Sequence, residues 1–291
     1  MKLDLDTGRY RAGGCNDLQI TDFPTGIDKL YEKKKHYKKL LAKNVKTLRN
    51  FQRKLYAHNR YAVLLVFQGM DASGKDGAVR HVFSGINPQG IQVFSFKQPS
   101  NEELDHDYLW RIHKRAPERG RFGIFNRSHY EEVLIAKQEP GVIEGQRLPD
   151  EFRDRPHFWE ERYRDIVQFE DYLYRNGTVI LKFYLHLSYE EQRKRLLRRI
   201  DKPDKNWKFA DSDLEVRGKW DQYETLYEEC LRKTSTPNAP WYVVPADDKR
   251  NARLIISQIL VSELTQLPVS FPEVSAERRE KLEAMRERLE V

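Results

Sequence analysis

Apolar residues occur in two patterns along the chain: short continuous runs of Val, Leu, Ile and Phe, and longer stretches in which they recur every three or four positions. The runs are typical of buried strands, and the recurring positions are typical of amphipathic helices. Because strands and helices alternate, the pattern predicts an α/β fold in which helices flank a parallel sheet of about five strands. The predicted strands are residues 62–67, 91–96, 122–125, 178–187 and 241–244.

The same pattern predicts how the chain is divided. The predicted parts are an irregular N-terminal arm (1–26), a long basic helix (27–58), a main domain with all the strands (59–270) and a charged tail (271–291). Two later helices begin with the spacing of a capping box, Ser100 with Glu103 and Ser188 with Glu191. The helices expected after residue 84 cover residues 100–112, 157–176, 188–199, 212–233 and 247–266, with residues 201–218 as a loop or hinged segment.

Composition narrows the class of protein. The chain has 291 residues, of which 33% are charged, and a mean hydropathy of −0.81. No apolar run approaches the roughly 18 residues that cross a bilayer, and the N-terminus has no signal-peptide core. Two cysteines, Cys15 and Cys230, are too few and too far apart for a disulfide framework or a zinc site. We therefore expect a cytoplasmic protein with free thiols and no membrane partner.

The charge balance predicts an anionic partner. The net charge is +7 and the pI is about 9.2, which suits nucleic acid, nucleotides or another phosphate polymer. Residues 27–58 carry many lysines, which could face such a polyanion. For this helix we favour the alternative, a solvated face of an amphipathic helix.

A glycine-rich loop follows the first predicted strand. Its sequence, Gly69-Met-Asp-Ala-Ser-Gly-Lys75, fits the pattern G-x-x-x-x-G-K, in which backbone N–H groups surround phosphates. Glycine allows the positive φ of the turn, and Lys75 adds a point charge for the phosphoryl oxygens. Apolar residues at helical spacing follow, so the loop joins a strand to a helix, as this motif requires. The predicted phosphate-binding residues are Gly69, Ala72, Ser73, Gly74, Lys75 and Asp76.

One position of the loop departs from the usual motif. Asp76 follows Lys75, where the motif has the Ser or Thr that ligates magnesium. A metal ligand must then come from elsewhere, and Asp71 inside the loop is the candidate. A carboxylate beside phosphates is repelled unless a cation lies between them. The loop therefore predicts Mg²⁺ as cofactor, with Asp71 as a ligand.

A second group of polar residues follows the predicted strand 122–125. Because ligands bind at the carboxyl ends of parallel strands, these residues are expected beside the loop. Asn126 stands where phosphate-loop kinases usually have a magnesium-binding Asp, and it could coordinate through its amide oxygen. Arg127 is expected to face the phosphates rather than form a surface salt bridge. Glu131 either lies near the metal or nucleotide or simply begins the next helix.

Basic residues are concentrated in one later segment. Arg195 and Arg199 are four positions apart, so they share a helix face. In small phosphoryl-transfer kinases, a mobile arginine-bearing lid follows the fourth strand and excludes water when it closes. We predict such a lid over about 190–218 rather than a solvated basic face. The basic residues concerned are Arg193, Lys194, Arg195, Arg198, Arg199, Lys202, Lys205 and Lys208.

The chain resembles the family-2 polyphosphate kinases in six segments: 69–77, 86–90, 96–100, 125–131, 207–209 and 239–242. The resemblance implies a P-loop kinase fold similar to thymidylate kinase, magnesium, and inorganic polyphosphate as the second substrate. It also implies reversible phosphoryl transfer to AMP or ADP, with GMP and GDP as further candidate acceptors, and we expect a homo-oligomer. The six similar segments together span roughly residues 60–250.

The resemblance also assigns roles to residues and leaves two open. Many family members have Asp at the position of Asn126, and the stretch 126–131 is similar to a subgroup, class III, that accepts both AMP and ADP. Many relatives have a basic residue where this chain has Gln89, so the residues that follow the polyphosphate chain are not assigned. The implied catalytic residues are Asp71, Lys75, Arg127, Arg193 and Arg198, with Asp71 and Asn126 at the metal and Asn126, Glu131 and Lys208 around the nucleotide.

Two other functions remain as alternatives. An ATP-dependent nucleoside or nucleotide kinase would share the fold, the loop and the lid, but Asp76 counts against it. A nucleic-acid-binding protein could use the basic helix 27–58 as its contact surface, with the phosphate loop incidental. We favour the polyphosphate-dependent enzyme, with no nucleic-acid partner.

Overall fold

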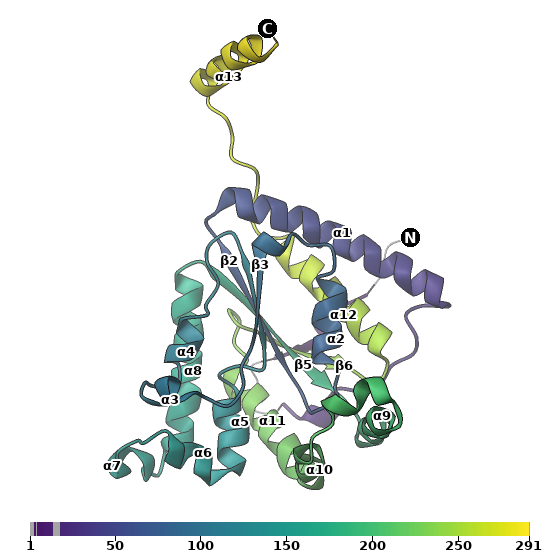
Figure 1. Cartoon of the computed structure of the whole chain (residues 1–291), viewed down its shortest axis with the longest axis vertical. Coiled ribbons are helices and arrows are strands. Elements are labelled where there is room, and N and C mark those ends of the chain that lie inside the picture. Colours follow the sequence, from purple (N-terminus) through teal and green to yellow (C-terminus); the bar gives the residue numbers. More distant parts are fainter. Residues whose placement is uncertain (1–2, 4, 14–17, 291) are drawn as a thin grey trace.

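Six strands form one sheet, in the order β1-β6-β5-β2-β4-β3, with helices on both faces (Figure 1). The computed structural model describes residues 3, 5–13 and 18–290. The five strands β2 to β6 are parallel to their neighbours, and β1 pairs antiparallel with β6 at one edge. The strands are β1 (Arg11–Ala12), β2 (Ala62–Gln68), β3 (Ile91–Ser95), β4 (Phe122–Asn126), β5 (Thr178–His186) and β6 (Trp241–Pro245).

The central strand β2 is buried along its whole length because helices cover both faces of the sheet. Alternate residues of a strand point to opposite faces. Val63, Leu65 and Phe67 accordingly pack on one side with α1 (Lys34–His58), α2 (Lys75–Val82) and α12 (Lys249–Leu264). Leu64 and Val66 pack on the other side. The helices there are α4 (Trp110–His113), α5 (Glu131–Gln138), α8 (Phe158–Arg175) and α11 (Trp220–Thr234).

The remaining elements are short or peripheral. The α-helices are α3 (Asn101–Leu104), α6 (Pro140–Gly145), α7 (Asp150–Arg153), α9 (Tyr189–Asp201), α10 (Ser212–Gly218) and α13 (Ala276–Leu289). The 3-10 helices are η1 (Gly8–Tyr10), η2 (Ile20–Asp22), η3 (Pro88–Gly90) and η4 (Pro203–Lys208). The fold is therefore the predicted α/β arrangement, with a mostly parallel sheet between two layers of helices.

The long N-terminal helix α1 is shorter than predicted. It begins at Lys34, and residues 27–33 are not helical. Tertiary contacts replace the helical ones in this segment: the N–H of Leu30 donates to Asn251 Oδ1, and the hydroxyl of Tyr31 donates to Asp248. Because these partners lie on or beside α12, the segment attaches α1 to the neighbouring helix.

Four other expectations differ from the structure. The predicted helix 100–112 is two short helices, α3 and α4, although the capping box of Ser100 and Glu103 is confirmed. The predicted helix 212–233 is interrupted at Lys219, directly after Gly218, a residue type that weakens helices. Residues 1–26 contain the edge strand β1, and the loop predicted over 201–218 contains η4 and α10.

The C-terminal helix α13 lies away from the body of the molecule (Figure 1). All of its described residues are exposed, and its charged side chains pair within the helix or with Glu290, the residue after it. Cys230 is free and buried, whereas Cys15 lies outside the described residues. Among the helices that the structure describes, none is both long enough and apolar enough to cross a membrane.

The burial of α1 leads to a prediction about stability. Leu55 is fully buried in the layer that α1 forms with α2 and α12, whereas Leu289 in α13 is 86% exposed. Replacing Leu55 with Ala should lower the free energy of unfolding by about 2–5 kcal/mol, because it removes buried methyl groups and leaves a cavity. Leu289→Ala should change it by less than about 0.5 kcal/mol. Urea unfolding of both variants provides the measurement, and equal effects would contradict the packing described here.

Candidate active site

The loop between β2 and α2 has the backbone geometry of a phosphate cradle. Gly69 and Gly74 have φ values of 147° and 109°, which glycine tolerates and other residues rarely adopt. A Cβ atom on Gly69 would lie 2.9 Å from the carbonyl oxygen of Leu185 in β5, so the loop also packs closely on the sheet. Ala72 has a φ of 64°, an unusual conformation for a residue with a side chain.

Lys75 lies over this loop. Its Nζ donates to the carbonyl oxygen of Gly69 at 2.5 Å and to that of Met70 at 3.4 Å. Burial lowers the pKa of Lys75, and the charge of Asp71 opposes that effect. The ammonium group is therefore held by carbonyl oxygens at the place where phosphate oxygens would bring negative charge.

Arg127 and Asp71 form the central ion pair of the site. Arg127 Nη2 donates to Asp71 Oδ1 at 2.9 Å, which joins the end of β4 to the phosphate loop. Arg127 has a φ of 63°, and its backbone N–H donates to the carbonyl of Phe67 in β2. A strained backbone of this kind is typical of functional sites.

Glu131 lies close to the same charges. Burial raises its pKa, while Arg127 and Lys75 counteract that effect. Burial also works against the charge of Arg127, but Glu131 and Asp71 outweigh it and raise the pKa of the guanidinium. The structure thus brings together Asp71, Lys75, Arg127 and Glu131, two cations and two anions from the loop and from the segment after β4.

Asn126 adds a second link between the same two segments. Its Nδ2 donates to Asp76 Oδ1 at 2.6 Å, so the residue after Lys75 is tied to the end of β4. The side-chain oxygen of Asn126 takes no part in that bond and can still act as a ligand. The predicted phosphate-binding residues Gly69 to Asp76 all belong to this loop and to the first turn of α2.

The oxygen atoms at the site suit magnesium. No group of three or more His, Cys, Asp or Glu side chains that could hold a metal occurs in the described part of the chain. Mg²⁺ does not need such a group, because it usually takes one or two carboxylates, several waters and the oxygens of substrate phosphates. Asp71, with 27% of its side chain exposed, and the amide oxygen of Asn126 fit that requirement.

Arg195 has a different place from the one predicted. It was expected to belong to a mobile lid, but its guanidinium is buried and bonded on all sides. Nη1 donates to the carbonyls of Ala72 and Ser73 at 3.0 and 2.8 Å, and Nη2 donates to those of Ala246 and Asp247 at 2.6 and 2.9 Å. Arg195 therefore braces α9 against the phosphate loop and the segment after β6.

The other predicted lid residues are not gathered at the loop. Arg193 is exposed on α9 and pairs with Glu190 at 3.2 Å, and Arg198 is also exposed on α9. Lys208 is exposed at the end of η4, with its ammonium 4.9 Å from the ring of Trp207. The described contacts do not join any of the three to Asp71, Lys75 or Arg127.

Two contacts that sequence reasoning missed hold the lid segment in this arrangement. Gln192 donates from Nε2 to the carbonyl of Asp71 at 3.1 Å and accepts from Arg217 of α10 at 3.0 Å. Arg199 pairs with Asp213 at 3.1 Å, which joins α9 to α10. Neither acceptor could be assigned from spacing alone, because each lies at least 14 positions away in the chain.

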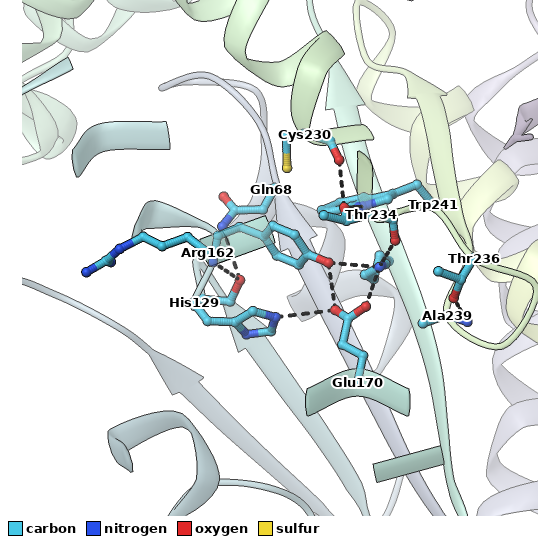
Figure 2. A network of polar contacts seen from close by, with 12 residues as sticks. Gln68, His129, Arg162, Glu170, Cys230, Thr234, Thr236, Ala239 and Trp241 are labelled. Atoms are coloured by element: carbon cyan, nitrogen blue, oxygen red, sulfur yellow. Dashed lines mark hydrogen bonds and ion pairs between the residues drawn. The ribbon is translucent and has the colours of Figure 1, made fainter. Parts of the chain in front are cut away.

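A buried polar network lies under the turn that carries Arg127. Lys182 in β5 donates to Glu170 at 2.5 Å, to the hydroxyl of Tyr130 at 2.8 Å and to the carbonyl of Thr234 at 2.8 Å. Figure 2 shows His129 and Glu170 pointing toward each other, and their nearest atoms are 3.3 Å apart. Lys182, His129 and Glu170 have at most 1% of their side chains exposed.

The network supplies partners for charges that water cannot reach. Burial in itself raises the pKa of Glu170, but Lys182 and His129 outweigh it, so the pKa lies below its ordinary value. Burial lowers the pKa of Lys182, yet its ammonium has three acceptors, as many as it has protons. Because His129 and Tyr130 follow Arg127 by two and three positions, the network fixes the turn that presents Arg127.

The family model described as Polyphosphate kinase 2 (PPK2) matches residues 31–271. This chain belongs to the polyphosphate kinase 2 family. The matched range includes the phosphate loop, the turn at Arg127, α9 and the buried network, so the family assignment covers every part of the site.

Relatives and solved structures of the PPK2 family agree with this assignment. An ADP-polyphosphate phosphotransferase of Rhodopseudomonas palustris is 52% identical over 287 residues, with 99% of each chain covered. An AMP/ADP-polyphosphate phosphotransferase of Meiothermus ruber is 46% identical over 226 residues, covering 78% of this chain and 80% of the relative. The crystal structure of polyphosphate kinase 2 from Arthrobacter aurescens TC1 matches with a TM-score of 0.84 and 36% identity, covering 97% of this chain and 99% of that one.

The buried ion pair leads to a prediction for this PPK2 chain. Glu170→Ala should lower the free energy of unfolding by about 3–5 kcal/mol, because it leaves the Lys182 ammonium buried without a counter-charge. The matched control is Glu190→Ala, which removes the same side chain from an exposed pair with Arg193 and should cost less than about 1 kcal/mol. Chemical denaturation of both variants tests this, and a Glu170→Ala protein as stable as the control would refute it.

Proposed function

We propose that this chain transfers the terminal phosphoryl group of inorganic polyphosphate to ADP, forming ATP, and to AMP, forming ADP. The observation that carries the proposal is the pairing of Asp71 with Arg127 beside Lys75, in a phosphate loop that has Asp76 in place of Ser or Thr. An arrangement with its own carboxylate inside the loop suits a metal-bound phosphate chain. The names of the relatives from R. palustris and M. ruber supply the donor class.

Separate observations support AMP and ADP as the phosphoryl acceptors. The relative that is 52% identical over 287 residues is named for ADP, and the relative from M. ruber is named for both AMP and ADP. The segment 126–131 is similar to the class III subgroup, which accepts both nucleotides, and this supports the use of AMP. GMP and GDP are further candidates, since the described site contacts specify phosphates rather than a base.

The chemistry needs no covalent intermediate. An oxygen of the acceptor's terminal phosphate attacks the last phosphorus of the polyphosphate in line. The bond from that phosphorus to the bridging oxygen breaks, and the shortened chain leaves with the oxygen and its negative charge. The net direction depends on the concentrations of nucleotide and polymer, because a phosphoanhydride bond is broken and another is formed.

The protein then has to position phosphates and offset their charge. We assign the backbone N–H groups of the loop and Lys75 to the phosphates, and Arg127 to the phosphoryl group in transfer. Asp71 and Asn126 would hold Mg²⁺, which when bound supplies positive charge between phosphate oxygens. Glu131 keeps Arg127 and Lys75 charged and in place.

Exposed basic residues of the predicted lid, about residues 190–218, are assigned a role as well. Arg193, Arg198 and Lys208 are exposed, so they are available to approach bound phosphates and exclude water. The division into an arm, a basic helix, a kinase domain with this lid and a charged tail stays a prediction. So do a homo-oligomeric state and a cytoplasmic location.

The first test is nucleotide synthesis by the purified protein. With magnesium and polyphosphate, we expect ATP from ADP, and ADP followed by ATP from AMP, as measured by chromatography of the products. Lys75→Ala should abolish both, since it removes the charge over the loop. ATP from ADP alone would exclude AMP as an acceptor. Transfer from ATP to a nucleoside or nucleotide, with no use of polyphosphate, would support the ATP-dependent alternative instead.

The second test concerns the carboxylate of the loop. Asp71→Asn keeps the size of the side chain but removes its charge, so kcat should fall at least about a hundredfold, the usual effect of losing one stabilising group at a transition state. The melting temperature should stay close to that of the wild-type protein, because Asp71 is partly exposed. A rate that stays unchanged at saturating magnesium would show that Asp71 does not hold the metal.

A further inference from the structure

A groove of about 660 Å³ lies outside the candidate active site, lined by residues of α1, of α12 and of the end of α2. In the fold, α12 packs against both α1 and α2 (Figure 1). Apolar side chains of α1, Leu41, Ala42 and Val45, form part of its lining. The rest of the lining is mostly basic. Its cations are Lys34, Lys38, Lys46, Arg49, Arg250 and Arg253, with His81 and Ser84 beside them.

The positive charge of this groove is not balanced. The lining contains no Asp or Glu, and none of its six Lys and Arg residues forms an ion pair within the described part of the chain. Arg253 lies against the hydroxyl of Tyr37 at 3.4 Å. Asp248 is near Arg250, but it accepts from the hydroxyl of Tyr31 and from the N–H groups of Arg250 and Asn251. A concave row of unpaired cations is the surface that attracts a polyanion.

Cations also connect the groove with the phosphate loop. Arg253 Nη2 lies 3.2 Å from the point that a Cβ atom on Gly77 would occupy, in the first turn of α2. The pKa of Lys249 is lowered to about 8 by burial and by the charges of Arg195 and Arg198, so three cations are crowded together here. Arg195 bonds the loop carbonyls and pairs with Glu191 at 2.8 Å, so a cluster of cations with one paired carboxylate lies between the loop and the groove.

We propose that the groove between α1, α2 and α12 binds the distal phosphates of a polyphosphate chain whose terminal phosphate lies in the loop at Lys75. The inference rests on the proposed function, because it assumes polyphosphate as the donor. Polyphosphate is a linear polymer with one charge per phosphate. The groove offers cations along one face of α1, at Lys34 and Lys38 and, after the turn that carries Ala42, at Lys46 and Arg49.

The geometry also predicts how long a polyphosphate chain must be to reach the groove from the loop. The helix α2 has eight residues and is about 12 Å long, and its far end lies beside the groove while its first turn carries Lys75. A chain of two or three phosphates held at the loop cannot extend that far. Long chains should therefore gain affinity from the groove, whereas the shortest donors should not.

The test compares two doubly substituted proteins with equal loss of charge. Lys38→Gln with Arg49→Gln removes two cations of the groove. Lys39→Gln with Lys54→Gln removes two exposed cations of α1 that do not line it. The KM for long-chain polyphosphate should rise about tenfold in the groove variant only, since an exposed charge contact is worth up to about a factor of five. On the shortest polyphosphate that the wild-type protein uses, KM and kcat should stay unchanged.

Direct binding of long-chain polyphosphate, without nucleotide, is measured in parallel at several salt concentrations. The slope of log affinity against log salt should fall by about two in the groove variant, one for each cation removed. Equal losses in both variants, a loss with short donors, or no loss with long chains would overturn the proposal. DNA binding by the same proteins is measured in the same way. If the groove variant lost DNA binding and kept its polyphosphate binding, the proposal would also be overturned. If the wild-type protein uses no polyphosphate as a donor, the proposed function fails, and the binding slopes still decide whether the groove holds the polymer.

Discussion

The buried guanidinium of Arg195 is the contact on which the arrangement of the site depends. It donates to carbonyls of the phosphate loop and of the segment after β6. Arg195 therefore joins α9 to two segments that are distant from it in the sequence. Buried carbonyl oxygens of the loop need donors, because an unpaired buried carbonyl costs about 1–3 kcal/mol. By donating to the carbonyls of Ala72 and Ser73, Arg195 satisfies these oxygens and holds the loop in its conformation.

Charged side chains are arranged differently in the core and in the surface groove. Inside the core, each charge is matched: Lys182 has Glu170 and two further acceptors, and no solvent reaches them. In the groove along α1, by contrast, the lining has cations and no carboxylate, and these cations form no ion pair among the described residues. A protein that binds a polymer of phosphates gains from this division, because matched charges hold the frame while unmatched ones attract the ligand.

The sequence was most informative where one local pattern decides the outcome. The strands are continuous apolar runs because the sheet is covered on both faces, so they could be predicted closely, and Asp71 and Arg127 were placed at neighbouring strand ends by the same logic. Residues 27–33 were misjudged because their apolar spacing is helical, while tertiary bonds from Leu30 and Tyr31 determine their conformation. The groove could not be found from sequence, since it exists only where three helices meet.

Arg195 and Arg198 show why a basic cluster cannot be assigned to one role from sequence. They lie three positions apart on α9, yet one is buried among carbonyls and the other is exposed beside Lys249. A lid that moved as a whole would have to break the bonds of Arg195, and the loop would lose its support at the moment when it must hold phosphates. Closure would break fewer contacts if the first turns of α9 stayed fixed and only the exposed segment beyond Leu196, with η4 and α10, moved, which requires Arg217 of α10 to release Gln192 and Tyr189. In that division we expect Arg195 to serve as the anchor, and Arg198 stays the proposed first basic residue beyond it that could approach bound phosphates.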